Sequence, residues 1–95
     1  MKVNINSVHF KIDKKLDEYI NEKIKKLSKF HQEIISSDVI LKLENTPTPE
    51  NKIAEIKLVI SGNDLFAMKK AKTFEEATDL AVEALRRQIE KTKEK

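Results

Sequence analysis

A segment with helical periodicity lies between two segments with strand periodicity, and this order restricts the folds open to the chain. Residues 2–8, KVNINSV, alternate polar and apolar side chains as a strand does. Asp13 has the side chain of a helix N-cap, and apolar residues recur from there to Lys29 at helical spacing. Their stripe consists of Leu16, Tyr19, Ile20, Ile24, Leu27 and Phe30. A helix in this place is a crossover connection, so the strands on either side of it are expected to be parallel.

Three further segments alternate as strands do. They span residues 37–45 (SDVILKLEN), 53–61 (IAEIKLVIS) and 65–71 (LFAMKKA). Pro47 and Pro49 mark the first connection as a loop, because proline cannot donate to a strand ladder. The sequence SGND before the last segment is typical of a turn, which predicts a hairpin.

A second helix is expected at the end of the chain. Thr73 and Glu76 have the T-x-x-E spacing of a capping box. The face that this helix buries is expected to consist of Phe74, Ala77, Ala81, Ala84, Leu85 and Gln88.

The element order is therefore β-α-β-β-β-α, and we expect an α+β fold with one domain covering residues 1–95. Both helices must cover one face of a four-stranded sheet, because nothing else in the chain can cover it. Two hairpins make the fourth strand parallel to the second. The two helices therefore run in the same direction, with their C-terminal halves at one end of the molecule.

Positive charge is gathered in three segments. Residues 23–29 carry +4, residues 69–72 carry +3, and residues 86–95 carry +3. Because the net charge of the chain is +3, its remaining 74 residues carry −7. Clustered cations on an otherwise acidic chain indicate a surface that faces a polyanion.

The predicted topology brings two of these basic segments together. The C-terminal halves of the two helices carry Lys23, Lys25, Lys26, Lys29, Arg86, Arg87, Lys91 and Lys93. Eight cations are more than two helix dipoles require, because placing a cation near a helix C-terminus stabilises the helix by only about 0.3–1 kcal/mol. The third segment, residues 69–72, lies near the helix N-termini, where it could extend a basic surface with Lys14 and Lys15. We favour the alternative of a charged strand edge that resists pairing with other chains.

Several other functions find no support in the residues. The chain has no cysteine and a single glycine, which excludes thiolate metal sites and glycine-rich phosphate loops. His9 and His31 are isolated, and no nucleophile, base and orienting group converge, so we expect no enzyme, metal, cofactor or small-molecule substrate. The aromatic residues are few and most fall in the predicted core, so base stacking is not expected. No membrane span or export signal is visible, which favours the cytoplasm of a bacterium.

Both helices and the first strand resemble the ribosome hibernation promoting factor family, also called the ribosome-associated inhibitor or sigma-54 modulation family. The first strand and helix match the family pattern at Val3, Asn4, Ile5, Leu16, Tyr19, Ile20, Lys23, Ile24, Lys26 and Leu27. The second helix matches it at Ala77, Asp79, Ala81, Leu85, Arg87, Gln88, Ile89, Lys91 and Lys93. The chain departs from the pattern at Ser7, where the family usually has glycine, and at Glu75 and Glu90.

The resemblance implies a fold like that of a double-stranded-RNA-binding domain. It also implies that the chain binds the small ribosomal subunit in the mRNA and tRNA channel and blocks translation under stress or in stationary phase. The partner would then be 16S-type ribosomal RNA. The matching basic positions are Lys23, Lys26, Arg87 and Lys91, and the shared helix surface adds Lys29 and Arg86. Whether the basic flanks of the two helices face each other depends on the helix order, which the sequence leaves open.

Two expectations concern the assembly. Longer family members carry a C-terminal dimerisation domain, and the chain resembles the short form without it, so we expect a monomer. Charged residues, Lys42, Glu44, Glu55 and Lys57, are expected to make the outer face of the sheet charged. The alternative function is a regulatory protein-interaction module that uses the sheet face or a strand edge, as sigma-factor modulation would require.

Overall fold

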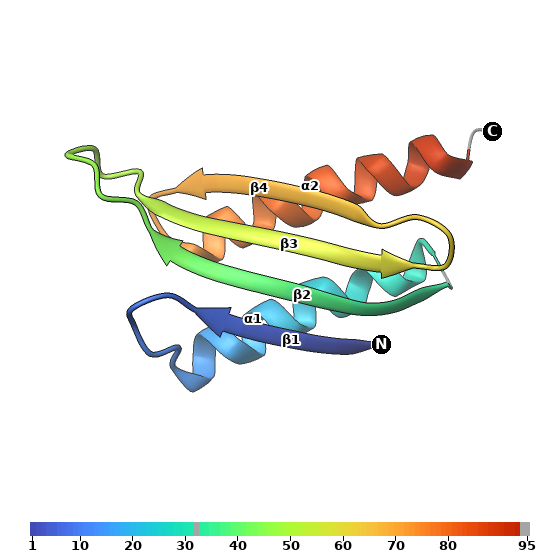
Figure 1. Ribbon diagram of the computed structural model, residues 1–95, viewed down its shortest axis with the longest axis horizontal. Coiled ribbons are helices and arrows are strands. Elements are labelled where there is room, and N and C mark those ends of the chain that lie inside the picture. Colours follow the sequence, from blue (N-terminus) through green and yellow to red (C-terminus); the bar gives the residue numbers. More distant parts are fainter. Residues whose placement is uncertain (32, 94–95) are drawn as a thin grey trace.

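The computed structural model describes residues 1–31 and 33–93. Figure 1 shows a single sheet with both helices on one of its faces. In chain order the elements are β1 (Lys2–Ser7), α1 (Lys14–Lys25), the short 3-10 helix η1 (Lys26–Lys29), β2 (Ile34–Leu43), β3 (Lys52–Ile60), β4 (Leu65–Ala71) and α2 (Phe74–Lys93). The expected α+β fold and its element order are confirmed.

The strands lie in the order β1-β2-β3-β4. β1 pairs with β2 in parallel, as the crossover through α1 requires, and the two hairpins make the other pairs antiparallel. One row across the sheet consists of Ile5, Val39, Ile56 and Ala67, all turned toward the helices. In the last hairpin Gly62 takes a φ of 86°, which a side chain would disfavour.

Each helix covers one half of the sheet. α2 lies on β3 and β4, and α1 packs beside α2 and against β1 (Figure 1). The helices contribute Ile20, Ile24 and Leu85 to the core, each with none of its surface exposed. α2 buries Thr78 and Ile89 more fully than the expected Phe74, Ala84 and Gln88, which are only partly buried. Gln88 instead lies at the sheet edge and donates from Nε2 to the Phe66 carbonyl at 2.9 Å.

Side-chain caps fix where the two helices begin. The Asp13 carboxylate accepts from the Leu16 N–H at 2.8 Å, and the Thr73 hydroxyl accepts from the Glu76 N–H at 3.1 Å. Both predicted N-caps are therefore confirmed. No helix in the described part of the chain is both long enough and apolar enough to cross a membrane.

The first helix does not continue as an α-helix to Lys29. It ends at Lys25, and η1 follows with about three residues per turn. This tighter winding rotates the last residues away from the predicted apolar stripe. Leu27 stays buried, whereas Phe30 is 37% exposed, so its assignment to the core was wrong.

The outer face of the sheet is only partly charged. Lys42 and Glu55 form an ion pair there, and Lys70 pairs with Glu44 at 2.7 Å. The same face also carries the exposed apolar side chains of Ile40, Phe66 and Met68. The expected charged residues therefore do lie on the outer face, but the face also carries large apolar side chains that were not expected.

The loop after β1 contains a backbone conformation that suits glycine. His9 has a φ of 65°, two residues beyond the position where the family pattern places glycine. The His9 side chain is exposed, so removing it costs little packing. A non-glycine residue in this region costs on the order of 1 kcal/mol or more. We therefore expect His9→Gly to raise the free energy of unfolding by about 0.5–1 kcal/mol in urea denaturation.

His9→Ala is the matched control, because it removes the same side chain and keeps the unfavourable φ. It should leave the stability of the protein unchanged or lower it. Equal stabilities of the glycine and alanine variants would show that the loop holds no strain at His9.

Candidate nucleic-acid interface

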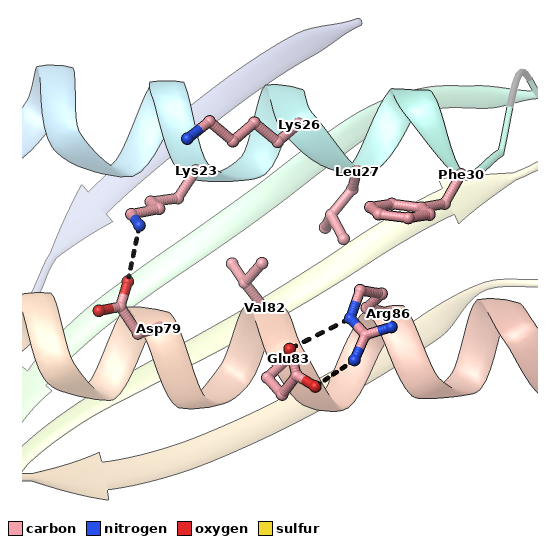
Figure 2. A pocket seen from close by; sticks show the side chains of 8 residues that line it. All are labelled: Lys23, Lys26, Leu27, Phe30, Asp79, Val82, Glu83 and Arg86. Carbon is pink, nitrogen blue, oxygen red and sulfur yellow. Dashed lines mark hydrogen bonds and ion pairs between the residues drawn. The ribbon is translucent and has the colours of Figure 1, made fainter.

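A groove separates the first helical segment from α2. Figure 2 shows its two walls. One wall consists of Lys23 from α1, Lys26 and Leu27 from η1, and Phe30 directly after η1. The other consists of Asp79, Val82, Glu83 and Arg86 from α2. The groove has a volume of about 290 Å³. It is formed because the parallel helices pack side by side on the sheet, so segments about 55 residues apart in sequence face each other.

Asp79 joins the two helices at one end of the groove. Its carboxylate accepts a hydrogen bond from the Tyr19 hydroxyl, with oxygen–oxygen distances of 2.7 and 2.8 Å. The Lys23 ammonium lies 3.7 Å from the same carboxylate and 5.3 Å from the centre of the Tyr19 ring. Lys23 is therefore held in place by an ion pair and by the face of an aromatic ring.

Arg86 is held in a similar way on α2. Its guanidinium donates to both oxygens of Glu83 and also to Glu90. It also lies 6.0 Å from the centre of the Phe30 ring on the opposite wall. The hydrogen bond from Arg86 lowers the pKa of Glu83, and the same bond raises the pKa of Arg86. The positive charge of Arg86 is therefore largely balanced by the carboxylates of Glu83 and Glu90.

The six basic residues predicted from the sequence divide into two groups of three. Lys23, Lys26 and Arg86 line the groove. Lys29, Arg87 and Lys91 are exposed and lie outside it. On α2, Arg87 is about 100° around the helix from Arg86, so it points away from α1. The Lys95 of the predicted basic terminus lies outside the described residues.

The four exposed cations of this set are the least neutralised. Arg87 is 72% exposed and its Nε lies 3.7 Å from Glu83, and Lys26 is 55% exposed with Glu22 at 4.0 Å. Within the described ranges, Lys29 and Lys91 form no ion pair shorter than 4.0 Å. Exposed pairs of this kind are worth little, so these side chains are available to another anion.

Sequence reasoning missed the acidic and apolar members of the groove. No cation lies one turn beyond Asp79 on its own helix, so the sequence around it indicates no partner. Its partners, Tyr19 and Lys23, are on the other helix and become visible only in the fold. No group of three or more His, Asp or Glu side chains among the described residues is arranged to hold a metal ion.

The only tyrosine in the chain reports on this helix contact. Burial and the hydrogen bond to Asp79 raise the pKa of Tyr19 from about 10 to about 12, with smaller contributions from the negative charges of Asp79, Glu75 and Glu22. The fold therefore favours the protonated hydroxyl. The raised pKa of Tyr19 means that its protonated hydroxyl stabilises the folded protein. This stabilisation is fully present below pH 10 and is lost as the pH rises through about 12.

We expect an ultraviolet absorbance titration of the native protein to place the tyrosinate midpoint near pH 12. In Asp79→Ala the midpoint should move back toward the ordinary value, because the carboxylate is gone. Glu76→Ala removes a carboxylate from the same helix that contributes nothing to the shift and serves as the control. Identical midpoints in the native protein and in Asp79→Ala would contradict the contact between the helices.

The sequence profile described as "Sigma 54 modulation protein / S30EA ribosomal protein" matches residues 3–95. The chain belongs to this family. Two curated proteins are also similar to this chain along its whole length. A ribosome hibernation promoting factor of Pseudomonas putida is 30% identical over 95 residues, which cover all of this chain and 89% of that protein. One from Azotobacter vinelandii is 34% identical over 95 residues, covering all of this chain and 85% of that protein.

Solved structures share the fold of this family member at lower identity. A ribosomal subunit interface protein from Coxiella burnetii has a TM-score of 0.87 at 20% identity, with full coverage of both chains. The N-terminal domain of Protein Y from Thermus thermophilus has a TM-score of 0.84 at 19% identity, covering 97% of this chain and 99% of that one. These two likenesses confirm the architecture of the sheet and the helices.

Proposed function

We propose that this chain is a ribosome hibernation factor. It binds 16S-type RNA of the small ribosomal subunit, occupies the channel for mRNA and tRNA, and so halts translation in the cytoplasm under stress or in stationary phase. The observation that carries the proposal is full-length similarity to curated ribosome hibernation promoting factors, together with a helical face that gathers cations from two distant segments.

The chemistry of that face suits structured RNA. Lys and Arg contacts to phosphates give affinity without reading sequence. Lys26, Lys29, Arg87 and Lys91 are exposed on helices, so their positions are set by a rigid scaffold that can match the shape of a folded RNA. Because this binding depends on phosphate charge, it should weaken steeply as salt concentration rises.

Sedimentation tests the proposal directly. The purified protein is mixed with ribosomal subunits and centrifuged through sucrose at low and at high salt. We expect it to migrate with the small subunit at low salt and to dissociate at high salt. In a cell-free translation reaction, a several-fold molar excess over ribosomes should stop protein synthesis, and unchanged synthesis at that excess would contradict the proposal.

The second candidate function is a protein-interaction module that uses the open face of the sheet. The exposed Ile40, Phe66 and Met68 favour it, because large apolar side chains on an uncovered face suit a protein partner. An apolar contact of this kind would persist at high salt, which separates it from RNA binding in the same gradients.

We further propose that the protein is a monomer, since ion pairs interrupt the apolar outer face of the sheet. Sedimentation equilibrium measures the mass of the free protein.

A further inference from the structure

The groove between the helices is poorly suited to a phosphate group. Asp79 and Glu83 lie in its wall, and a phosphate placed there would face two carboxylates. Of the three cations in its walls, Lys23 and Arg86 are already engaged by these acids, and only Lys26, which is 55% exposed, remains weakly paired, with Glu22 at 4.0 Å. The other available cations, Lys29 and Arg87, lie outside the groove.

The interior of the groove has a different chemistry. Leu27 and Val82 give it an apolar floor, and the Phe30 ring stands at one end (Figure 2). Phe30 is 37% exposed, although it lies in the most basic part of the molecule. An apolar cavity with an aromatic ring and a few polar groups is typical of a site for a small planar ligand.

We infer that this groove takes one unpaired nucleobase of the bound RNA, stacked on Phe30. The inference rests on the proposed function and adds the chemical group that enters the groove. The Glu83 and Asp79 carboxylates can accept hydrogen bonds from the amino or imino N–H groups of a base, which is a role that acids play in base recognition. The backbone on either side of the base then passes the exposed cations Lys26 and Lys29, which neutralise its phosphates.

The occupant follows from the charges around the site. A ligand with a neutral planar part and anionic flanks matches an apolar groove that has acids in its walls and exposed cations around it. Nucleotides in single-stranded or bulged RNA have this character, because their bases are free to leave the stack. Phe66 provides the contrast within the same chain: it is 53% exposed, but it lies on the open sheet face and lines no part of this groove.

A tryptophan in place of Phe30 makes the stacking measurable, because the chain contains no other tryptophan. Phe30→Trp is titrated at low salt with oligoadenylate and with an abasic ribose-phosphate oligomer of the same length and charge. We expect oligoadenylate to quench the fluorescence and the abasic oligomer to leave it unchanged. In the matched variant Phe66→Trp neither oligomer should quench. Absence of quenching by oligoadenylate in Phe30→Trp, or equal quenching by both oligomers, would overturn the inference.

Phe30→Leu tests the same contact on the ribosome, since leucine keeps an apolar side chain and removes the ring. Its affinity for the small subunit should fall by on the order of ten-fold, because stacking contributes about one such factor per base. The salt dependence of binding should stay that of the wild type, because no phosphate contact is lost. Lys29→Ala should instead reduce the slope of log affinity against log salt by about one.

The two failures are distinguishable. If the wild-type protein does not sediment with the small subunit, the proposed function is wrong, and the fluorescence titration still decides whether the groove takes a base. If the wild type binds and Phe30→Leu binds equally well, the proposed function stands and the base site is wrong. Thermal unfolding of each variant shows that the fold is retained.

Discussion

Replacing Lys26, Lys29, Arg87 and Lys91 together with glutamate is expected to abolish binding to the small ribosomal subunit while leaving the fold intact. Each replacement changes the charge by two units, so the net charge falls from +3 to −5. All four side chains are exposed, and none belongs to the buried core. In the corresponding single variants, each lost phosphate contact should reduce the slope of log affinity against log salt concentration by about one.

A second quadruple variant controls for net charge. Lys2, Lys11, Lys69 and Lys72 are also exposed but lie on β1, in the loop after it, and at the β4 edge. Their replacement with glutamate gives the same net charge of −5 without changing the helical face. We expect this variant to bind with reduced on-rate but to remain bound in gradients. Loss of binding in both variants, or in neither, would show that the helical face is not the specific RNA surface. Circular dichroism checks the fold of both.

Truncating Leu85 to alanine is expected to give the largest loss of stability. The Leu85 side chain is completely buried where α2 meets the sheet. Leu→Ala substitutions in a well-packed core cost about 2–5 kcal/mol, because they remove apolar burial and leave a cavity. In a domain of this size each kcal/mol lowers the melting temperature by about 4–8 °C. Differential scanning calorimetry should therefore show a fall of at least about 8 °C in the melting temperature.

Leu80→Ala is the matched control, with the same substitution in the same helix. Leu80 is 44% exposed, so its truncation should change the free energy of unfolding by less than about 0.5 kcal/mol. Because Leu80 and Leu85 have the same helix propensity, the difference between the two variants isolates burial. Similar losses in both variants would mean that α2 packs on the sheet through a different face.

The local patterns in the sequence were sufficient for the architecture. Alternation of apolar residues located four strands, and helical spacing located two helices. The capping side chains of Asp13 and Thr73 fixed where those helices begin. The crossover rule then made β1 parallel to β2, and chain direction made the helices parallel. These features depend on interactions between near neighbours in the chain or on connection handedness, both of which a single sequence contains.

The composition of the groove depended on tertiary structure. Helix order decides which flank of each helix faces the other, and it places Arg86 in the groove and turns Arg87 away, although the two are adjacent in sequence. The partnership of Asp79 with Tyr19 and Lys23 joins residues about 60 positions apart, so no spacing rule predicts it. The change from α to 3-10 winding after Lys25 rotates Phe30 out of the core and into the groove. Sequence periodicity thus determined most of the residues that are buried against the sheet, including Ile20, Ile24 and Leu85. Only the packing of one helix beside the other decided which charges are neutralised and which remain free for a partner.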